Sequence, residues 1–391
     1  MAKFGKKNHV SLNPLDANIC LLGTPKVGKT TLMKEVAEEL VGSDGYLFLE
    51  MYRENGAKYI EDIVYENVPN WETFIEIIDD IIDNRTTDYA ELKVVFIDTL
   101  DNALQLAEQE SIRLWNKENP GKKTNSINSA WGGFMKGQDK ACDLLQEQFF
   151  RLREVGIAPS YIGHVRTTNV TDPITLENYQ QLTSDVTQRY FGQIKKNIDL
   201  VALAYIDREI VTQRNDNGGN KKVNKVESEV RKIKFRDSNY AVDAGGRFRY
   251  IQDECDFTPS AFITAMRDAL ETEVKSKGKS VESRKEEDVK REKQKFEEVA
   301  KQNEEAKSDK NQLAKIVSDI IAFVSENKSN TDVISVIMEA CRERGYANPK
   351  EISDVNDAKA ILARISVRPE GSPIIAVYIS TFLCYEDVFF C

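Results

Sequence analysis

The chain has 391 residues, of which 41% are hydrophobic and 30% are charged, and its 54 Lys and Arg against 64 Asp and Glu give a formal net charge of −10. This composition excludes a wholly disordered, collagen-like or disulfide-scaffold protein. Apolar runs stay below the ~18 residues of a membrane helix, and no apolar signal segment follows the basic N-terminus. We therefore expect a cytoplasmic protein without a membrane partner. Scattered cysteines and histidines predict neither a zinc site nor a disulfide framework.

Short apolar runs alternate with segments of helical periodicity after a polar stretch, residues 1–16, that we expect to be a flexible arm. Predicted strands cover residues 18–22, 46–49, 94–97, 158–162 and 200–206, and predicted helices cover residues 30–40, 71–82 and 137–154. Strands that alternate with helices indicate an α/β fold with a mostly parallel sheet flanked by helices. We assign this core to residues 17–270.

The second half of the chain changes character. Two apolar-polar runs, 209–213 and 230–235, flank a glycine-bearing turn and predict a β-hairpin extension of about residues 207–251. Residues 271–310 hold 12 basic and 12 acidic residues, which predicts a charged helical linker. Helical periodicity returns in a small domain at 311–366. The tail, 367–391, has no assignment beyond a short strand at 374–382.

A phosphate-binding motif lies between the first predicted strand and the first predicted helix. It matches the P-loop pattern GxxxxGK[ST], in which glycines let backbone N–H groups converge on phosphate oxygens. We expect Lys29 to bridge the β and γ phosphates and the Thr30 hydroxyl to bind Mg²⁺. The predicted nucleotide-binding residues are Gly23, Thr24, Pro25, Lys26, Val27, Gly28, Lys29, Thr30 and Thr31.

Carboxylates that follow later strands complete the predicted site. Asp98 ends the apolar run 94–97, where a P-loop protein places its second magnesium-binding group. The same position also suits a helix cap. Hydrolysis needs a further carboxylate for the attacking water, and Glu50 and Glu54, which follow the strand 46–49, are both candidates. A guanine-reading NKxD motif is absent, because Asn119 stands where its Asp would be, so ATP is favoured.

The order of these motifs resembles the RecA-like ATPases of bacteriophages, annotated in that family as phage nucleotide-binding proteins and including Sak-type single-strand annealing and recombination ATPases. The resemblance rests on the P-loop, on Asp98-Thr99-Leu100-Asp101-Asn102, on a strand that ends at Ile162-Gly163-His164, and on residues 185–191, 199–208 and 235–250. It covers roughly residues 17 to 255 and leaves the C-terminal segments aside.

The resemblance implies a RecA-like P-loop core that hydrolyses ATP with Mg²⁺, works as a homo-oligomer and occupies the cytoplasm of a bacterial host. It places the water-activating carboxylate before a glycine, which favours Glu54 over Glu50, and it places a polar γ-phosphate sensor at His164. RecA itself has glutamine there, so His164 is similar in position only. An arginine that reaches a neighbouring subunit is also implied, with Arg166, Arg208, Arg236 and Arg247 as candidates.

The distribution of charge gives only weak support for DNA binding. Residues 189–249 carry 14 Lys and Arg against 8 Asp and Glu inside an acidic chain, which suits either a phosphate track or a solvated hairpin. Long polar loops are expected at 116–137 and 166–190, and aromatic residues between lysines can stack bases. The candidate DNA-binding residues are Lys122, Lys123, Trp131, Phe134, Lys136, Lys195, Lys196, Lys221 and Lys222.

Two hypotheses remain from the sequence. The first is an ATPase that binds single-stranded DNA during recombination or replication. The second is a nucleotide-gated scaffold that assembles with a protein partner through the C-terminal helices and makes no contact with DNA. A small-molecule kinase is disfavoured, because no lid segment is evident.

Overall fold

The computed structural model of the chain describes residues 10–171, 175–214, 222–236 and 243–366, without the side chains of 209–214, 222–227 and 365–366. Most of the expected N-terminal arm and the whole tail, with its predicted strand at 374–382, lie outside these ranges.

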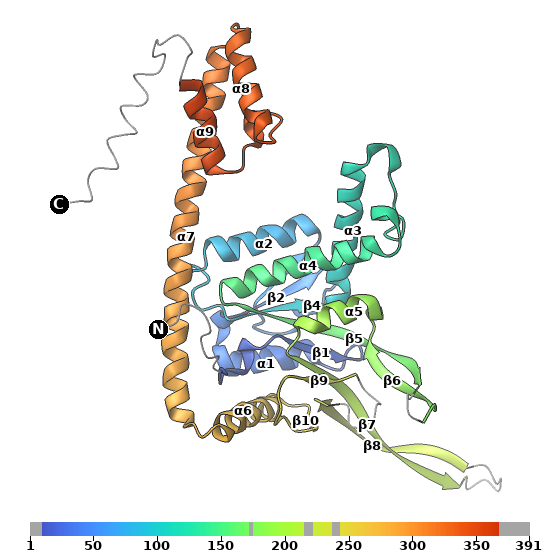
Figure 1. The fold of residues 1–391 in the computed structure, drawn as a ribbon. Coiled ribbons are helices and arrows are strands. Elements are labelled where there is room, and N and C mark those ends of the chain that lie inside the picture. The colour runs from blue at the N-terminus through green and yellow to red at the C-terminus, as the bar shows by residue number, and fades with distance from the viewer. Residues whose placement is uncertain (1–9, 172–174, 215–221, 237–242, 367–391) are drawn as a thin grey trace. The chain divides into compact units, whose positions relative to one another are not determined.

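Ten strands of the described chain form one sheet, in the order β10-β8-β7-β1-β5-β4-β2-β3, with β6 beside β5 and β9 beside β7 (Figure 1). Six neighbouring strands, from β3 to β7, run parallel, and β6, β8, β9 and β10 are antiparallel additions. The strands are β1 (Ile19–Gly23), β2 (Tyr46–Met51), β3 (Tyr65–Val68), β4 (Val94–Asp98), β5 (Ala158–Thr171), β6 (Asn178–Ser184), β7 (Leu200–Arg214), β8 (Lys222–Lys234), β9 (Gly245–Gly246) and β10 (Glu254–Asp256).

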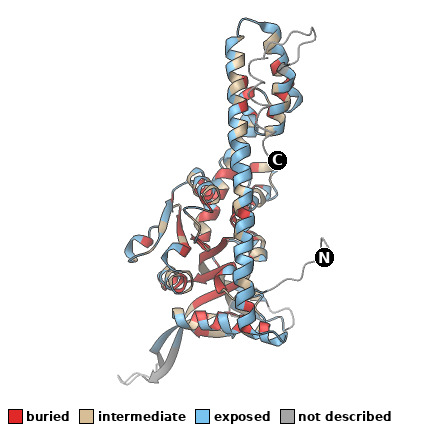
Figure 2. Cartoon of the chain, turned by 90° about the vertical axis from the view of Figure 1, so that its left-hand side faces the viewer, coloured by how far each residue is buried: buried red, intermediate tan, exposed pale blue. Residues whose placement is uncertain are grey.

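Helices cover both faces of this sheet, which confirms the predicted α/β class. One core cluster joins the sheet to α2, α3, α4 and α5, and a second cluster on the opposite face joins it to α1 and α6. The central strands are buried throughout (Figure 2). The described helices are α1 (Lys29–Val41), α2 (Trp71–Asp83), α3 (Leu100–Glu118), α4 (Lys136–Glu154), α5 (Gln188–Ile194), α6 (Pro259–Ser276), α7 (Val281–Glu326), α8 (Thr331–Glu343) and α9 (Val355–Ser366).

Residues 166–190, expected to be a long polar loop, instead contain a β-hairpin. β5 continues past the sheet core to Thr171 and pairs antiparallel with β6, from Val165 opposite Ser184 to Thr171 opposite Asn178. The loop prediction was wrong because both strands are mainly polar and are exposed or only partly buried beyond the core, so they lack the apolar alternation that marks a strand. The extension predicted at about 207–251 overlaps the long antiparallel pair of β7 and β8, which begins at Leu200 and ends at Lys234.

The chain divides into two compact units after Val299. The predicted charged linker, 271–310, comprises the end of α6 and the first part of α7, and the residues of α7 up to Val299 group with the first unit. Lys93 forms an ion pair with Glu292 of this helix. In the second unit, the end of α7 packs with α8 and α9 around Ile320, Ile337 and Ile361. None of the helices in the described ranges is long and apolar enough to cross a membrane.

Candidate active site

The P-loop joins the carboxyl end of β1 to the first residue of α1. Gly28 has φ of +104°, a left-handed conformation that glycine adopts without strain. The buried Lys29 donates hydrogen bonds from Nζ to the carbonyl oxygens of Gly23 (3.1 Å) and Thr24 (3.0 Å). Burial lowers the pKa of Lys29, while Asp98, Asp101 and Glu54 act in the opposite direction. The loop therefore holds an ammonium group at its centre.

Thr30 and Asp98 meet across the loop, although 68 residues separate them. The Thr30 hydroxyl donates a hydrogen bond of 2.7 Å to Asp98 Oδ2, and Asp98 is 4% exposed at the end of β4. The pKa of Asp98 is raised to about 7, chiefly by burial; Glu54 and Glu50 contribute to the rise, whereas Thr30 and Lys29 oppose it. A hydroxyl and a carboxylate oxygen thus lie together near Lys29.

Glu50 and Glu54 occupy different environments at the end of β2. Glu50 lies opposite Asp98 in the β2–β4 register, is 2% exposed, and accepts a hydrogen bond of 2.5 Å from the Ala57 amide. Its Oε2 has no hydrogen-bond partner in the described chain. Glu54 is half-buried in the following turn and interacts electrostatically with Lys29, Asp98 and His164. Glu54, rather than Glu50, shares the site with all three groups.

His164 reaches the same edge from β5, which lies between the P-loop strand β1 and β4. It is the register partner of Gly23, and its Nδ1 lies 3.4 Å from Asp101 Oδ1 at the start of α3. This contact raises the pKa of His164, against the effects of burial and of Lys29. The strand order thus explains how a residue distant in sequence joins the phosphate site.

A magnesium ion fits the oxygen donors present. Magnesium is held through one or two protein ligands together with substrate phosphates, and the Thr30 hydroxyl and the Asp98 carboxylate supply ligands of that kind. No group of three or more His, Cys, Asp or Glu side chains that could hold a metal occurs in the described ranges. Burial, which raises the pKa of Asp98, disfavours the ionised form of this carboxyl, and a nearby cation would favour that form.

The loop between α3 and α4 contains one exposed and one clamped aromatic residue. Phe134 is 93% exposed. Trp131 donates from its indole nitrogen to the Ser111 carbonyl at 3.2 Å, and its ring lies 5.8 Å from that of Trp115. All five residues from Trp131 to Met135 have positive φ. The structure therefore presents Phe134 to solvent, with Lys122, Lys123 and Lys136 exposed on the same loop, and holds Trp131 against α3.

The remaining basic candidates are not gathered at one place. Lys195 forms an ion pair with Asp243, whereas Lys196 is exposed. Lys221 and the side chain of Lys222 lie outside the described residues. Most of the candidate arginines have partners in the same chain: Arg208 with Glu229, Arg247 with Asp199, and Arg236 with the carbonyls of Phe248 and Arg249. Arg166 is exposed and donates to the Ser184 carbonyl.

Sequence reasoning missed Arg231 of β8, whose side chain reaches the P-loop at Val27. Its only signal was a positive charge within the basic segment 189–249.

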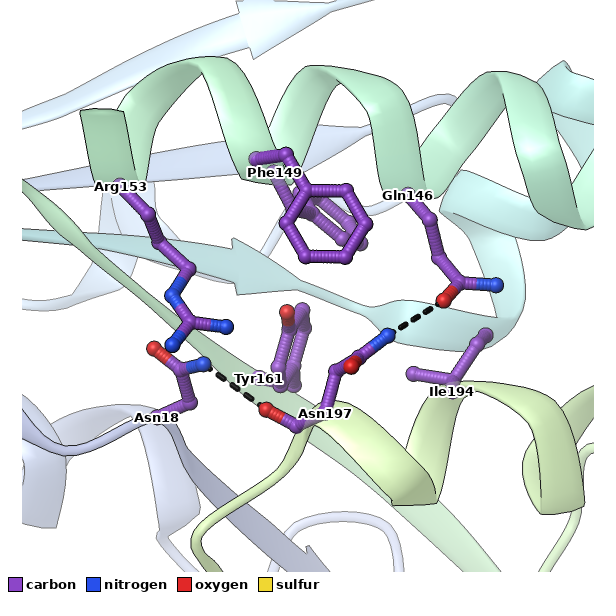
Figure 3. A pocket seen from close by; sticks show the side chains of 8 residues that line it. Asn18, Gln146, Phe149, Arg153, Tyr161, Ile194 and Asn197 are labelled. Carbon is purple, nitrogen blue, oxygen red and sulfur yellow. Dashed lines mark hydrogen bonds between the residues drawn. The ribbon is translucent and has the colours of Figure 1, made fainter. Parts of the chain in front are cut away.

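A small pocket lies away from this site (Figure 3). It has a volume of about 10 Å³ and is lined by Asn18, Gln146, Phe149, Arg153, Tyr161 and Asn197, among others. Asn18 immediately precedes β1, so the cavity is at the amino end of that strand, opposite the P-loop. A volume of this size holds about one water molecule, and the cavity is therefore no rival to the P-loop as a substrate site.

Comparison with known proteins gives one family and only distant structural similarity. No curated protein matches the chain. Among solved structures, a prototypical ATPase from the type III secretion system of pathogenic bacteria is 14% identical, with 48% of this chain and 51% of that chain covered and a TM-score of 0.29. The flagellar accessory protein FlaH from Methanocaldococcus jannaschii is 10% identical, with 56% and 78% covered and a TM-score of 0.26. The chain spans about half the length of the first of these.

The family assignment rests on a match over more than half of the chain. A family model described as AAA domain matches residues 15–248, from just before β1 to just after β9. The matched region contains the P-loop, Asp98, both glutamates and His164. The chain belongs to this AAA domain family of P-loop ATPases.

Proposed function

We propose that the chain binds and hydrolyses ATP at the edge of the sheet where Lys29, Thr30, Asp98, Glu54 and His164 meet. The observation that carries this proposal is the 2.7 Å hydrogen bond between Thr30 and Asp98, beside the buried Lys29. It unites the P-loop with a carboxylate from a strand that is distant in sequence. A simple helix cap would require no such contact.

The roles follow from position. The backbone of residues 23–31 holds the phosphates, and the Lys29 ammonium leaves the carbonyls of Gly23 and Thr24 to neutralise the β and γ phosphates. Thr30 and Asp98 hold Mg²⁺, which, when bound, neutralises charge that develops on the phosphates.

Glu54 orients and deprotonates the attacking water. It is half-buried rather than enclosed, and its charge is felt by Lys29, Asp98 and His164, which flank the phosphate position. Glu50 instead anchors the turn that carries Glu54, because one of its oxygens holds the Ala57 amide. His164 contacts the γ-phosphate, and its contact with Asp101 favours the protonated ring that an anionic phosphate attracts.

We further propose that the substrate polymer is single-stranded DNA and that the protein is a RecA-like ATPase of the phage, Sak-type kind, acting as a homo-oligomer in a bacterial cytoplasm. Support for DNA comes from the exposed Phe134 on a loop that carries Lys122, Lys123 and Lys136. Support for the phage kind comes from the sequence motifs alone. The C-terminal helices would then serve a protein partner.

The test is ATP turnover measured with and without single-stranded DNA. We expect magnesium-dependent turnover that DNA accelerates and that Lys29→Ala abolishes. Turnover that is absent, or that survives Lys29→Ala, would refute the ATPase proposal. Turnover that DNA leaves unchanged, together with no binding of labelled single strands at low salt, would refute the DNA proposal and favour the nucleotide-gated scaffold.

A further inference from the structure

Arg231 brings a side chain of the β extension into contact with the P-loop. Its Nη1 donates a hydrogen bond of 3.0 Å to the Val27 carbonyl, across 204 residues of sequence. A Cβ atom placed on Gly28 would lie 3.4 Å from the same nitrogen. β8 is the second strand from β1, beyond β7, so the contact comes from outside the parallel core of the sheet.

Phe257 lies against the same part of the loop. It follows β10 and precedes α6, which packs beside α1. Its Cε1 would be 3.4 Å from a Cβ on Gly28, and the Arg231 guanidinium carbon is 5.4 Å from the centre of its ring. A flat aromatic ring and a planar cation therefore stand next to each other at Gly28.

The strand order places the proposed catalytic residues and Arg231 on opposite sides of β1. Asp98, Glu54 and His164 come from β4, from the turn after β2 and from β5, which all lie on one side of β1. Arg231 comes from β8, on the other side of β1. A triphosphate on the P-loop must direct its reacting γ end toward the catalytic carboxylates. Its nucleoside end is then free to extend toward β7, β8 and the start of α6.

The charge of Arg231 is not neutralised by a neighbour. In the described part of the chain, the only hydrogen bond recorded for its guanidinium is to the Val27 carbonyl, and no carboxylate forms an ion pair with it. Arg208 of the adjacent strand β7, by contrast, is paired with Glu229. A guanidinium has five N–H donors in a fixed planar arrangement, so the donors that Val27 does not use are available to an anion.

We propose that Arg231 and Phe257 form the nucleoside end of the nucleotide site. Phe257 stacks on the base, and Arg231 donates hydrogen bonds to the α-phosphate while it remains attached to the P-loop through Val27. This inference rests on the proposed function, because it requires the P-loop to bind a nucleoside triphosphate. It assigns the contact with the base to a part of the chain that contains none of the proposed catalytic residues.

The test compares ATP with inorganic tripolyphosphate, which has the phosphates and lacks the nucleoside. Calorimetric titrations with the full chain and Mg²⁺ measure both affinities. We expect Phe257→Leu, which keeps an apolar side chain and loses the flat ring, to weaken ATP roughly fivefold to a hundredfold. Its affinity for tripolyphosphate stays within twofold of the unaltered chain. Phe257→Trp keeps a flat ring and retains ATP binding.

Arg231→Met is expected to weaken ATP and tripolyphosphate alike, about tenfold or more, because a charged hydrogen bond to phosphate is lost from both. Arg249→Met and Tyr250→Leu are the matched controls. In this pair the guanidinium carbon lies 5.5 Å from the ring centre, close to the 5.4 Å between Arg231 and Phe257, and in the described chain the pair makes no hydrogen bond with the P-loop. Both controls should bind ATP as the unaltered chain does.

The outcomes separate this inference from the proposed function. If the unaltered chain binds neither ATP nor tripolyphosphate, the proposed function fails. If it binds ATP, and Phe257→Leu lowers both affinities equally or neither, the base contact is wrong. Arg231→Met with unchanged affinity for both ligands would overturn the phosphate contact. Thermal unfolding of each variant identifies a loss of binding that comes from misfolding. If Arg231→Met misfolds, Arg231→Lys, which retains the charge, is used in its place to test the phosphate contact.

Discussion

Replacement of Asp98 by Asn should make the nucleotide-free protein more stable at neutral and alkaline pH while it abolishes activity. Burial raises the pKa of Asp98 from 3.8 to about 7, so the folded state prefers the protonated form. At ~1.4 kcal/mol per pKa unit, ionisation of this carboxyl costs the fold up to about 4 kcal/mol. Asparagine is similar in size and avoids that cost.

The sign of the pH dependence follows by linkage. A carboxyl whose pKa is raised on folding stabilises fully below its unfolded pKa, and that stability is lost as the pH rises through the folded value. The free energy of unfolding of Asp98→Asn should therefore match that of the unaltered chain at pH values below the unfolded pKa of 3.8. As the pH rises toward about 7, the variant should become progressively more stable than the unaltered chain. Above pH 8 the difference between their free energies of unfolding should be constant.

Tryptophan fluorescence during urea unfolding is a suitable assay, because the three tryptophans, Trp71, Trp115 and Trp131, all lie in the first unit. Asp101→Asn is the matched control. Its contact with His164 holds the pKa of Asp101 below the ordinary value in spite of burial, so ionised Asp101 stabilises the fold above its unfolded pKa. Asp101→Asn should thus lose stability at pH 7, with the loss disappearing as the pH falls.

Two results would refute this reasoning. Asp98→Asn could be less stable than the unaltered chain at pH 8 by up to ~2 kcal/mol, as expected for the loss of a helix cap. Alternatively, the difference between the two proteins could be independent of pH, which would mean that Asp98 is not a buried carboxyl with a raised pKa. Either result would remove the electrostatic argument for a cation at this site.

Other predictions concern catalysis and DNA. Lys29→Ala should abolish tight ATP binding, measured by titration, because the phosphate charge loses its counterpart. Glu54→Gln should bind ATP and lose turnover, since an amide accepts no proton; normal turnover would exclude Glu54 as the base. Glu50→Gln should keep measurable turnover, and complete loss would make Glu50 the base. Phe134→Ala should weaken single-strand binding by ~1–3 kcal/mol without changing its salt dependence, whereas Trp131→Ala should mainly lower thermal stability.

Local signals in the sequence were sufficient to identify the residues at the centre of the candidate site. The P-loop motif lies in a run of eight residues, and Asp98 ends an apolar run, so both could be predicted without knowledge of the fold. The order of the parallel strands then brings them together, because parallel strands place their carboxyl ends at the same edge of a sheet.

Contacts between distant segments could not be predicted. The Arg231–Val27 hydrogen bond joins a residue of β8 to a residue of the P-loop, and no motif connects the two. The β5–β6 hairpin is mainly polar, with few apolar residues such as Val165 and Leu182, and its backbone pairing gives no strong apolar alternation in the sequence. The sequence around Trp131 suggests an exposed base-stacking residue, whereas in the structure its indole nitrogen donates a hydrogen bond to the Ser111 carbonyl. For Arg231 and Trp131, the partner lies elsewhere in the chain and has no regular spacing from it.

The division of α7 at Val299 determines where the ATPase unit can be separated from the rest of the chain. Composition suggests a cut at residue 270, yet α7 supplies Asp288 to the Leu12 amide, Glu292 to Lys93 and the Phe296 ring to Arg85. Truncation at 270 would leave the buried Arg85 without its aromatic neighbour and expose a face that the helix covers. An expressed fragment that ends shortly after Val299 retains these contacts and is the appropriate starting point for crystallisation with nucleotide.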